Sequence, residues 1–117
     1  MLETSKKIAL EISKIIDDKK GQDICILDIH RISSFADYFV IASGTSTRQV
    51  KAIADELDDK MKEHGLCLDH KEGYENGRWV LLDFLQVVVH IFLDEERTFY
   101  NLERVWKDAP YINVDIG

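Results

Sequence analysis

Hydrophobic side chains recur at helical spacing in three segments of the chain. Residues 4–20 carry an apolar stripe at i, i+4, i+7 and i+8, and they end in two lysines and a glycine, which suit the last turn and the stop of a helix (Ile8, Ile12, Ile15, Ile16; Lys19, Lys20, Gly21). Residues 47–64 and 94–107 have the same spacing (Val50, Ile53, Ala54, Leu57, Met61; Phe99, Leu102, Trp106). The pattern predicts three amphipathic helices.

The start of the second helix and the end of the third have clear local signals. Ser46 and Gln49 form a capping box, in which the serine hydroxyl and the glutamine side chain bond to each other's free backbone amides. Gly65 follows the second helix as its stop. Pro110 closes the third helix, and the tail 111–117 has no assignment.

Five short apolar runs, partly β-branched, predict five strands. They cover 23–28, 38–42, a run that begins at 66–68 and continues to 72, then 78–83 and 87–92. The first two read as strands buried on both faces, 73–77 as a hairpin loop, and the short link 84–86 favours an antiparallel last pair. Because each helix needs a sheet face for its stripe, the order αββαβββα predicts an α/β fold with a mixed five-stranded sheet flanked by helices.

Length and composition indicate one folded domain over residues 1–117. Apolar residues make up 45% and charged residues 32% of the 117, as in globular chains. The longest apolar run is broken by His90, far short of the roughly 20 residues that cross a bilayer, so no membrane partner is expected. The N-terminus has no secretory signal pattern. We expect a cytoplasmic protein in which Cys25 and Cys67 are free, buried thiols.

The acidic charge balance bears on the kind of partner. With 15 basic and 22 acidic side chains the net charge is −7, whereas nucleic-acid binding depends on Lys and Arg contacts to phosphates. Direct specific nucleic-acid binding is therefore not expected. An acidic protein is steered toward basic partners, and proteins that coat ribosomal RNA are a common basic surface.

The turn Gly44-Thr45-Ser46 lies between a strand and a helix, where backbone amides could cradle a phosphate. It lacks the lysine of a P-loop and the spaced glycines of a dinucleotide site, which favours a turn with a helix cap. A nucleotidyltransferase also needs converging carboxylates to bind its metal ions, but Asp69 and Glu72 point to opposite faces of their strand. A nucleotide-binding enzyme that uses this turn is the alternative hypothesis.

No histidine has metal-ligand spacing to a cysteine, and no nucleophile–base pair is recognisable. His90, inside an apolar strand, is typical of a hydrogen-bonded core or interface group. We therefore expect no catalytic residue, metal or cofactor.

The tract from Tyr74 to Phe92 offers a candidate interface. Alternation places Trp79, Leu81 and Asp83 on one face of a strand. The residues between and after them lie on the other face (Val80, Leu82, Phe84). Either helices cover both faces, or the face that ends in Asp83 is left for a partner. Tryptophan and tyrosine beside charges match the composition of interface hot spots.

Three segments, in order and at their spacings, resemble the ribosomal silencing factor family, also called Iojap-like. They are Asp37 to Ser46 with Arg48, then Trp79 to Asp83 with Val87 to Phe92, and Glu96-Arg97 with Phe99 to Glu103 and Trp106. The resemblance covers about residues 4–107 and leaves 108–117 as a tail. In the family, Gly-Asp usually precedes the valine run, where this chain has Leu85-Gln86.

The resemblance implies a nucleotidyltransferase-like topology without catalytic carboxylates, and a protein that is not an enzyme. It also implies binding to the fourteenth protein of the large ribosomal subunit, on the intersubunit face, so that the small subunit cannot join and translation is repressed. Family members look like homodimers when free. The residues expected to bind the partner are the apolar anchors Trp79 and Leu81, the acidic Glu72 and Asp83, and the neighbouring Tyr74.

Overall fold

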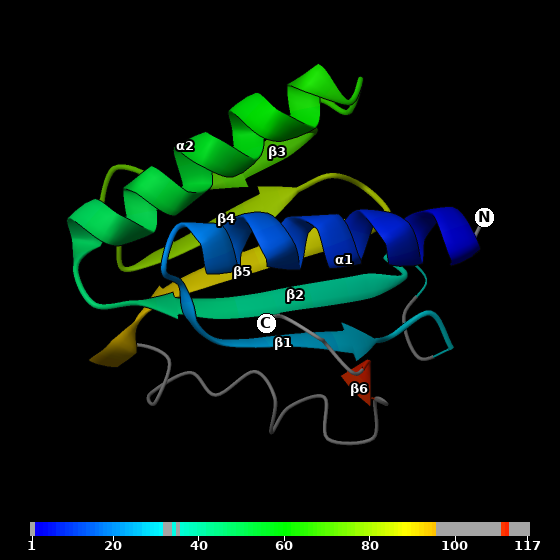
Figure 1. Cartoon of the computed structure of the whole chain (residues 1–117), viewed down its shortest axis with the longest axis horizontal. Coiled ribbons are helices and arrows are strands. Elements are labelled where there is room, and N and C mark those ends of the chain that lie inside the picture. The colour runs from blue at the N-terminus through cyan, green and yellow to red at the C-terminus, as the bar shows by residue number, and fades with distance from the viewer. Residues whose placement is uncertain (1, 32–33, 35, 96–110, 113–117) are drawn as a thin grey trace.

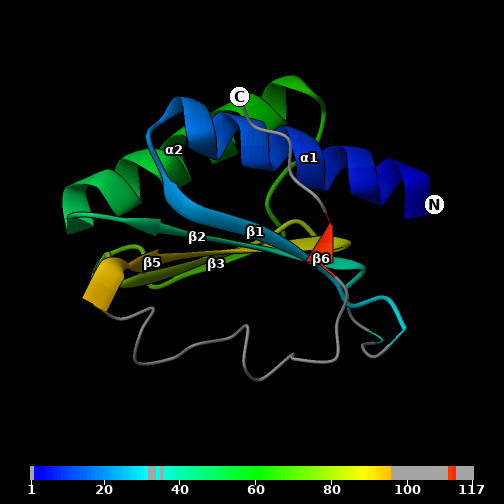
Figure 2. The same cartoon turned by 60° about the horizontal axis from the view of Figure 1, so that its bottom comes forward.

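The described part of the chain folds into two layers, a twisted sheet and two helices that lie across one of its faces (Figures 1 and 2). The computed structural model describes residues 2–31, 34, 36–95 and 111–112. The elements are α1 (Leu2–Asp18), β1 (Gln22–Asp28), β2 (Tyr38–Gly44), α2 (Thr47–Glu63), β3 (His70–Glu72), β4 (Trp79–Asp83), β5 (Val87–Leu93) and β6 (Tyr111–Ile112).

The strands form one mixed sheet in the order β3-β4-β5-β2-β1-β6. β2 and β5 run parallel at its centre and the other pairs are antiparallel, including the expected β4–β5 pair. All seven residues of β2 are buried, which explains its continuous apolar run. The predicted mixed sheet of five strands is confirmed. The two-residue β6, from the tail without an assignment, pairs with β1 as a sixth strand.

The main core lies between the helices and the sheet. The helices predicted over 4–20 and 47–64 are confirmed as α1 and α2, and their apolar stripes pack on the sheet face beneath them. Each fully buried aliphatic side chain there contributes about 1.5–3 kcal/mol through removal of apolar surface from water. The stripe residues and the strand residues that face them are buried (Ile12, Ile16, Val50, Ile53, Leu57, Ile26, Val40, Val80, Leu82, Val89, Ile91).

A second, smaller cluster lies on the opposite face of the sheet, the face away from α1 and α2. Its members come from β1, β2, β5 and the segment between β1 and β2, and partly buried residues of β1 and β4 pack against it (Leu27, Ile29, Ala36, Phe39, Ile41, Val88, Phe92; Cys25, Trp79, Leu81). The sheet therefore has an apolar layer on each side.

The predicted third strand begins too early. Residues 66–68 are not a strand, because α2 ends in a left-handed turn at Gly65 (φ 81°) in which the Leu66 amide donates to the Met61 carbonyl at 2.8 Å. Pairing with β4 starts only where the Asp69 amide donates to the Asp83 carbonyl, at 2.8 Å. Cys67 is consequently exposed rather than buried, and neither it nor the half-buried Cys25 forms a disulfide.

The predicted helix 94–107 falls mostly outside the described residues. Asp94 and Glu95 are helical, which agrees with the expected start, and its apolar positions Phe99, Leu102 and Trp106 are not described.

Candidate partner-binding site

Pairing between β3 and β4 builds one surface from residues that are distant in sequence. Glu72 lies opposite Leu81, and His70 lies opposite Asp83. Residues paired across two strands project to the same face, so these four side chains share a face with Trp79, two positions before Leu81. The predicted alternation along β4 is confirmed, since Val80 and Leu82 are fully buried on the helix side.

Exposure on this face rises toward the edge of the sheet. Phe92 of β5 is fully buried, Trp79, Leu81 and Asp83 of β4 are partly exposed, and the Glu72 side chain of β3 is 65% exposed. We call Glu72, Trp79, Leu81 and Asp83 the Trp79 patch. A hollow of about 310 Å³ lies within it, lined by Glu72, Gly73, Trp79 and Leu81. The patch combines an apolar centre with an acidic rim.

Gly73 lines this hollow at a position that has no room for a side chain. Its φ is 77°, a conformation that residues with a side chain rarely adopt, and an added Cβ would lie 2.0 Å from the Trp79 carbonyl oxygen. No other residue would fit without moving the start of β4. The glycine therefore fixes the position of the strand that carries Trp79.

The Trp79 indole is held by its neighbours on β5. Its Nε1–H donates to His90 Nδ1 at 3.1 Å, and its ring stacks on Phe92 with centroids 4.9 Å apart and an interplanar angle of 27°. The Phe39 ring meets His90 edge-on at 4.7 Å. Such aromatic pairs contribute about 0.5–1.5 kcal/mol beyond their buried area. The exposed part of Trp79 is therefore the edge of an ordered aromatic cluster.

His90 matches the expectation of a hydrogen-bonded core or interface group. It is 4% exposed, and burial lowers its pKa from 6.5 to about 4 because the charged form loses its hydration. At neutral pH the ring is uncharged, and Nδ1 is free to accept the bond from Trp79. His90 therefore contacts the patch through its hydrogen bond with Trp79.

The acidic residues of the patch differ in how firmly they are held. Asp83 Oδ1 accepts a hydrogen bond from the Leu85 amide at 2.7 Å, which fixes this carboxylate at the end of β4. Glu72 Oε2 lies 3.1 Å from His70 Nε2, with both side chains largely exposed. The Asp83 carboxylate is therefore bonded to the backbone, whereas the Glu72 carboxylate contacts an exposed side chain.

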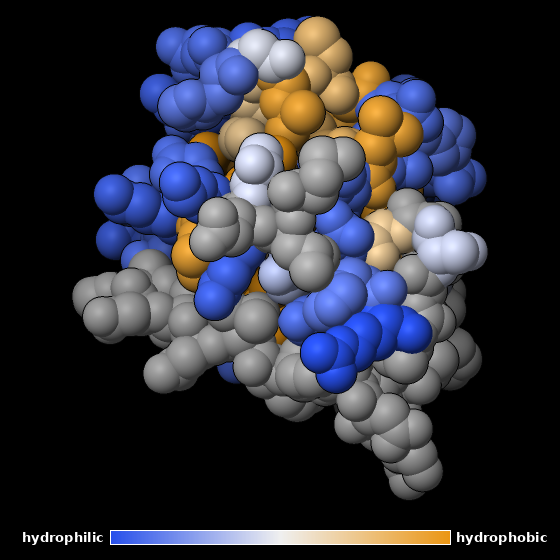
Figure 3. All heavy atoms as spheres, turned by 90° about the vertical axis from the view of Figure 1, so that its right-hand side faces the viewer, coloured by the Kyte–Doolittle hydropathy of each residue, from blue (hydrophilic) through white to orange (hydrophobic). Residues whose placement is uncertain are grey.

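The loop between β4 and β5 contains the departure from the family pattern. Leu85, where the family has glycine, keeps the left-handed backbone that a glycine would adopt (φ 76°), and its side chain is 58% exposed. The loop geometry thus survives the substitution at a cost of about 1–2 kcal/mol of backbone strain. Figure 3 looks onto this end of the molecule, where hydrophobic residues (orange) reach the surface among hydrophilic ones (blue).

Tyr74 does not lie with the other four predicted residues. It packs against the core on the helix side, its hydroxyl donates to Asp55 Oδ2 of α2 at 2.9 Å, and the Lys71 ammonium lies 4.6 Å from its ring centre. The hydrogen bond to Asp55 raises the pKa of the Tyr74 hydroxyl. Tyr74 therefore links the 73–77 loop to α2.

Sequence reasoning missed His70, Gly73 and Leu85 as neighbours of the patch. His70 becomes visible only when β3 is paired with β4 in the right register. Gly73 matches a loop glycine in sequence, and its close approach to the Trp79 backbone follows only from the structure. Leu85 carries no sequence signal of a left-handed conformation, because leucine rarely adopts one.

The Gly44-Thr45-Ser46 turn is explained by its own contacts. The Ser46 hydroxyl accepts from the Gln49 amide at 3.1 Å, so the predicted cap is confirmed, while the Gln49 side chain bonds the Thr45 amide at 2.7 Å rather than that of Ser46. A Cβ on Gly44 would lie 2.9 Å from a Val50 methyl, so close packing of β2 on α2 requires glycine. Two of the amides that a phosphate would use are already bonded.

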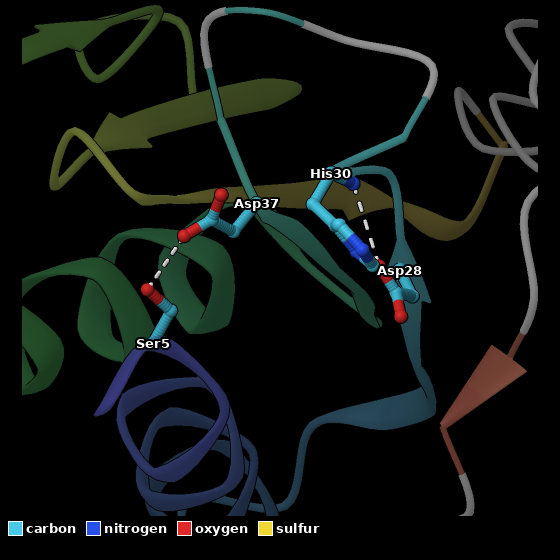
Figure 4. A network of polar contacts seen from close by, with 4 residues as sticks. All are labelled: Ser5, Asp28, His30 and Asp37. Carbon is cyan, nitrogen blue, oxygen red and sulfur yellow. Dashed lines mark hydrogen bonds and ion pairs between the residues drawn. The ribbon is translucent and has the colours of Figure 1, made fainter. Parts of the chain in front are cut away.

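Figure 4 shows a polar network between the start of α1 and the segment that leads into β2. The buried Ser5 hydroxyl donates to Asp37 Oδ2 at 2.7 Å, and His30 bonds separately to Asp28. Ser5 and His30 therefore contact different carboxylates, and the pair does not form the serine–histidine contact of a nucleophilic site. The Ser5–Asp37 bond instead ties α1 to the sheet.

The described residues form neither a metal-binding cluster nor a membrane-spanning helix. Within the part of the chain that the structure describes, no three His, Cys, Asp or Glu side chains gather closely enough to hold a metal ion. Neither α1 nor α2, the helices among the described residues, is long and apolar enough to cross a membrane.

Comparison with known proteins identifies the family. The model of the family described as "Ribosomal silencing factor during starvation" matches residues 2–116, which includes most of the 108–117 tail. A Bacillus subtilis protein named ribosomal silencing factor RsfS is 48% identical over 101 residues, or 86% of each chain.

Other relatives agree. A mouse protein named mitochondrial assembly of ribosomal large subunit protein 1 is 35% identical over 79% of this chain and 42% of its own length. A crystal structure of a protein from Bacillus halodurans superimposes with a TM-score of 0.80 at 39% identity, over 96% of this chain and 99% of that one. These similarities support a regulatory role in silencing the ribosome, and the chain belongs to the ribosomal silencing factor family.

Proposed function

We propose that this protein silences the ribosome by binding the large subunit through the Trp79 patch. The observation that carries the proposal is that two partly exposed apolar side chains, Trp79 and Leu81, share one face of the sheet with the carboxylates of Glu72 and Asp83. The name of the mouse relative, which refers to assembly of the ribosomal large subunit, favours that subunit as the particle bound.

The chemistry of the patch suits a basic ribosomal protein. An aromatic anchor in a hollow with a charged rim is the arrangement in which hot-spot residues contribute most of the binding energy. The net charge of −7 steers the chain toward positive surfaces. The family resemblance names the fourteenth protein of the large subunit, on the intersubunit face, as the partner. In this assignment Trp79 and Leu81 enter an apolar recess, and Glu72 and Asp83 meet Lys or Arg side chains.

The proposed mechanism is occlusion, without catalysis or a cofactor. If the protein and the small subunit need the same face of the large subunit, each must weaken the binding of the other by the same factor. Repression of translation then requires only occupancy. Binding to ribosomes would place the protein in the cytoplasm. We further propose that the free protein is a homodimer, which sedimentation equilibrium would test.

Co-sedimentation with purified ribosomal particles tests the proposal. The protein should travel with free large subunits and be depleted from joined ribosomes, and small subunits added in excess should displace it. Equal occupancy of free large subunits and joined ribosomes would contradict occlusion. Binding to small subunits alone would contradict the assigned particle.

A further inference from the structure

The Trp79–His90 pair joins a partly exposed indole to a buried imidazole. His90 is buried, its Nδ1 accepts from Trp79, and its Nε2 has no hydrogen-bond partner among the described residues. Because Nδ1 is the acceptor, the proton of the neutral ring lies on Nε2. A buried N–H without a partner costs stability, and an apolar residue of similar size would avoid that cost at this position. Among the described residues, the hydrogen bond that the His90 ring makes is therefore the one with Trp79.

The bond fixes the indole in one orientation. The strand register places Leu81 opposite His90 and Trp79 opposite Phe92, so the indole reaches diagonally across to His90 while it stacks on Phe92. Stacking is only weakly directional, whereas the Nε1–Nδ1 hydrogen bond requires one orientation of the indole. The indole N–H is thereby directed toward β5.

We propose that His90 is a positioning residue that holds the Trp79 indole in the orientation in which it binds the ribosomal partner. This inference rests on the proposed function of the Trp79 patch. Ordering the anchor before contact lowers the entropy that binding must otherwise overcome. Since the indole N–H is already satisfied, the partner needs an apolar recess with no hydrogen-bond acceptor for Trp79.

A double-mutant cycle on large-subunit binding tests the coupling. His90→Leu should weaken binding about tenfold in the wild-type chain, because the indole loses its fixed orientation. In the Trp79→Phe background, which keeps a stackable ring but lacks the N–H, His90→Leu should change affinity less than twofold. Equal factors in both backgrounds would overturn the proposal.

A matched pair of variants guards against misfolding of His90→Leu. His90→Asn places a carbonyl oxygen near the position of Nδ1, whereas His90→Gln places it near that of Nε2. Asn should restore most of the affinity and Gln should not. Equal affinities for the two folded variants would contradict a role of the Nδ1 acceptor.

A spectroscopic signature gives a readout that needs no ribosome. The chain has two tryptophans, and Trp79→Phe assigns the Trp79 indole signal in a ¹H–¹⁵N spectrum. In the wild type this proton should exchange slowly with solvent, and His90→Leu should speed its exchange at least tenfold. Unchanged exchange would overturn the inference.

The binding data also distinguish failure of the proposed function from failure of the proposed role of His90. Normal large-subunit binding by Trp79→Ala overturns the proposed function and the inference with it. Weak binding by Trp79→Ala together with normal binding by His90→Leu overturns the inference alone.

Discussion

The two faces of β4 differ in what surrounds them. Val80 and Leu82 are fully buried beneath α2, while Trp79 and Leu81, their immediate neighbours in sequence, are partly exposed beside a hollow on the other face. One strand of five residues thus supplies core residues and a candidate docking surface at alternate positions. Substitutions at positions 80 and 82 should therefore change stability, whereas substitutions at positions 79 and 81 should change binding.

The largest effect should come from the helix-covered face. Leu82→Ala should lower the free energy of unfolding by about 3–4 kcal/mol, through lost transfer free energy and the cavity left behind. Urea denaturation measures it. The fraction that remains folded should bind large subunits as the wild type does. A loss below 1 kcal/mol, or normal stability with impaired binding, would remove the distinction between the faces.

The second effect is a pH dependence on the patch side. Folding lowers the pKa of His90 from 6.5 to about 4, so between these values the unfolded chain takes up a proton that the folded chain does not. The contribution of neutral His90 to the free energy of unfolding is complete above pH 6.5. It falls by about 3 kcal/mol as the pH drops toward 4, at about 1.4 kcal/mol per pKa unit. Urea titrations at pH 7, 6 and 5 measure the free energy of unfolding against pH. It should fall more steeply with decreasing pH in the wild type than in His90→Leu. Identical slopes for the two proteins would contradict it.

A smaller effect concerns the acidic rim. Asp83→Asn keeps the oxygen that accepts from the Leu85 amide but removes the charge, and it should slow association with large subunits by about two- to threefold at low salt. Added salt should slow association of the wild type more than it speeds release. Asp59→Asn, which removes a charge from an exposed site on α2, is the matched control and should leave association unchanged. Equal slowing by both variants would mean that the net charge, and not the acidic rim, directs the encounter.

The smallest effect should be a gain in stability. Leu85→Gly removes the side chain from a left-handed residue and should raise the free energy of unfolding by about 1 kcal/mol, once the greater freedom of the unfolded glycine is subtracted. Thermal melting can detect this change. A decrease would mean that the exposed leucine packs favourably enough to offset its strain.

The fold was largely predictable because its strongest signals are local. The stripes of α1 and α2, the Ser46 cap and the period-two alternation of β4 each specify an element without knowledge of the rest of the chain. The start of β3 was not predictable in this way. Leu66 and Leu68 look like strand residues, yet the left-handed turn at Gly65 directs them back onto the core.

The candidate site was predicted in part for the same reason. Trp79, Leu81 and Asp83 share a face by alternation alone, whereas Glu72 joins them through a register that the sequence does not specify. The bond from Trp79 to His90 depends on a diagonal contact between β4 and β5. Tyr74 is close to Trp79 in sequence, but the loop turns it toward α2.

Subunit joining, followed by light scattering, tests most directly whether the Trp79 patch silences the ribosome. The wild type should suppress joining of purified subunits, and Trp79→Ala should need about thirty-fold more protein for the same suppression, as expected for loss of about 2 kcal/mol at a hot spot. Leu10→Ala, which removes an apolar side chain 37% exposed on α1, should act like the wild type. A folded Trp79→Ala protein that suppresses joining at wild-type concentrations would contradict the account.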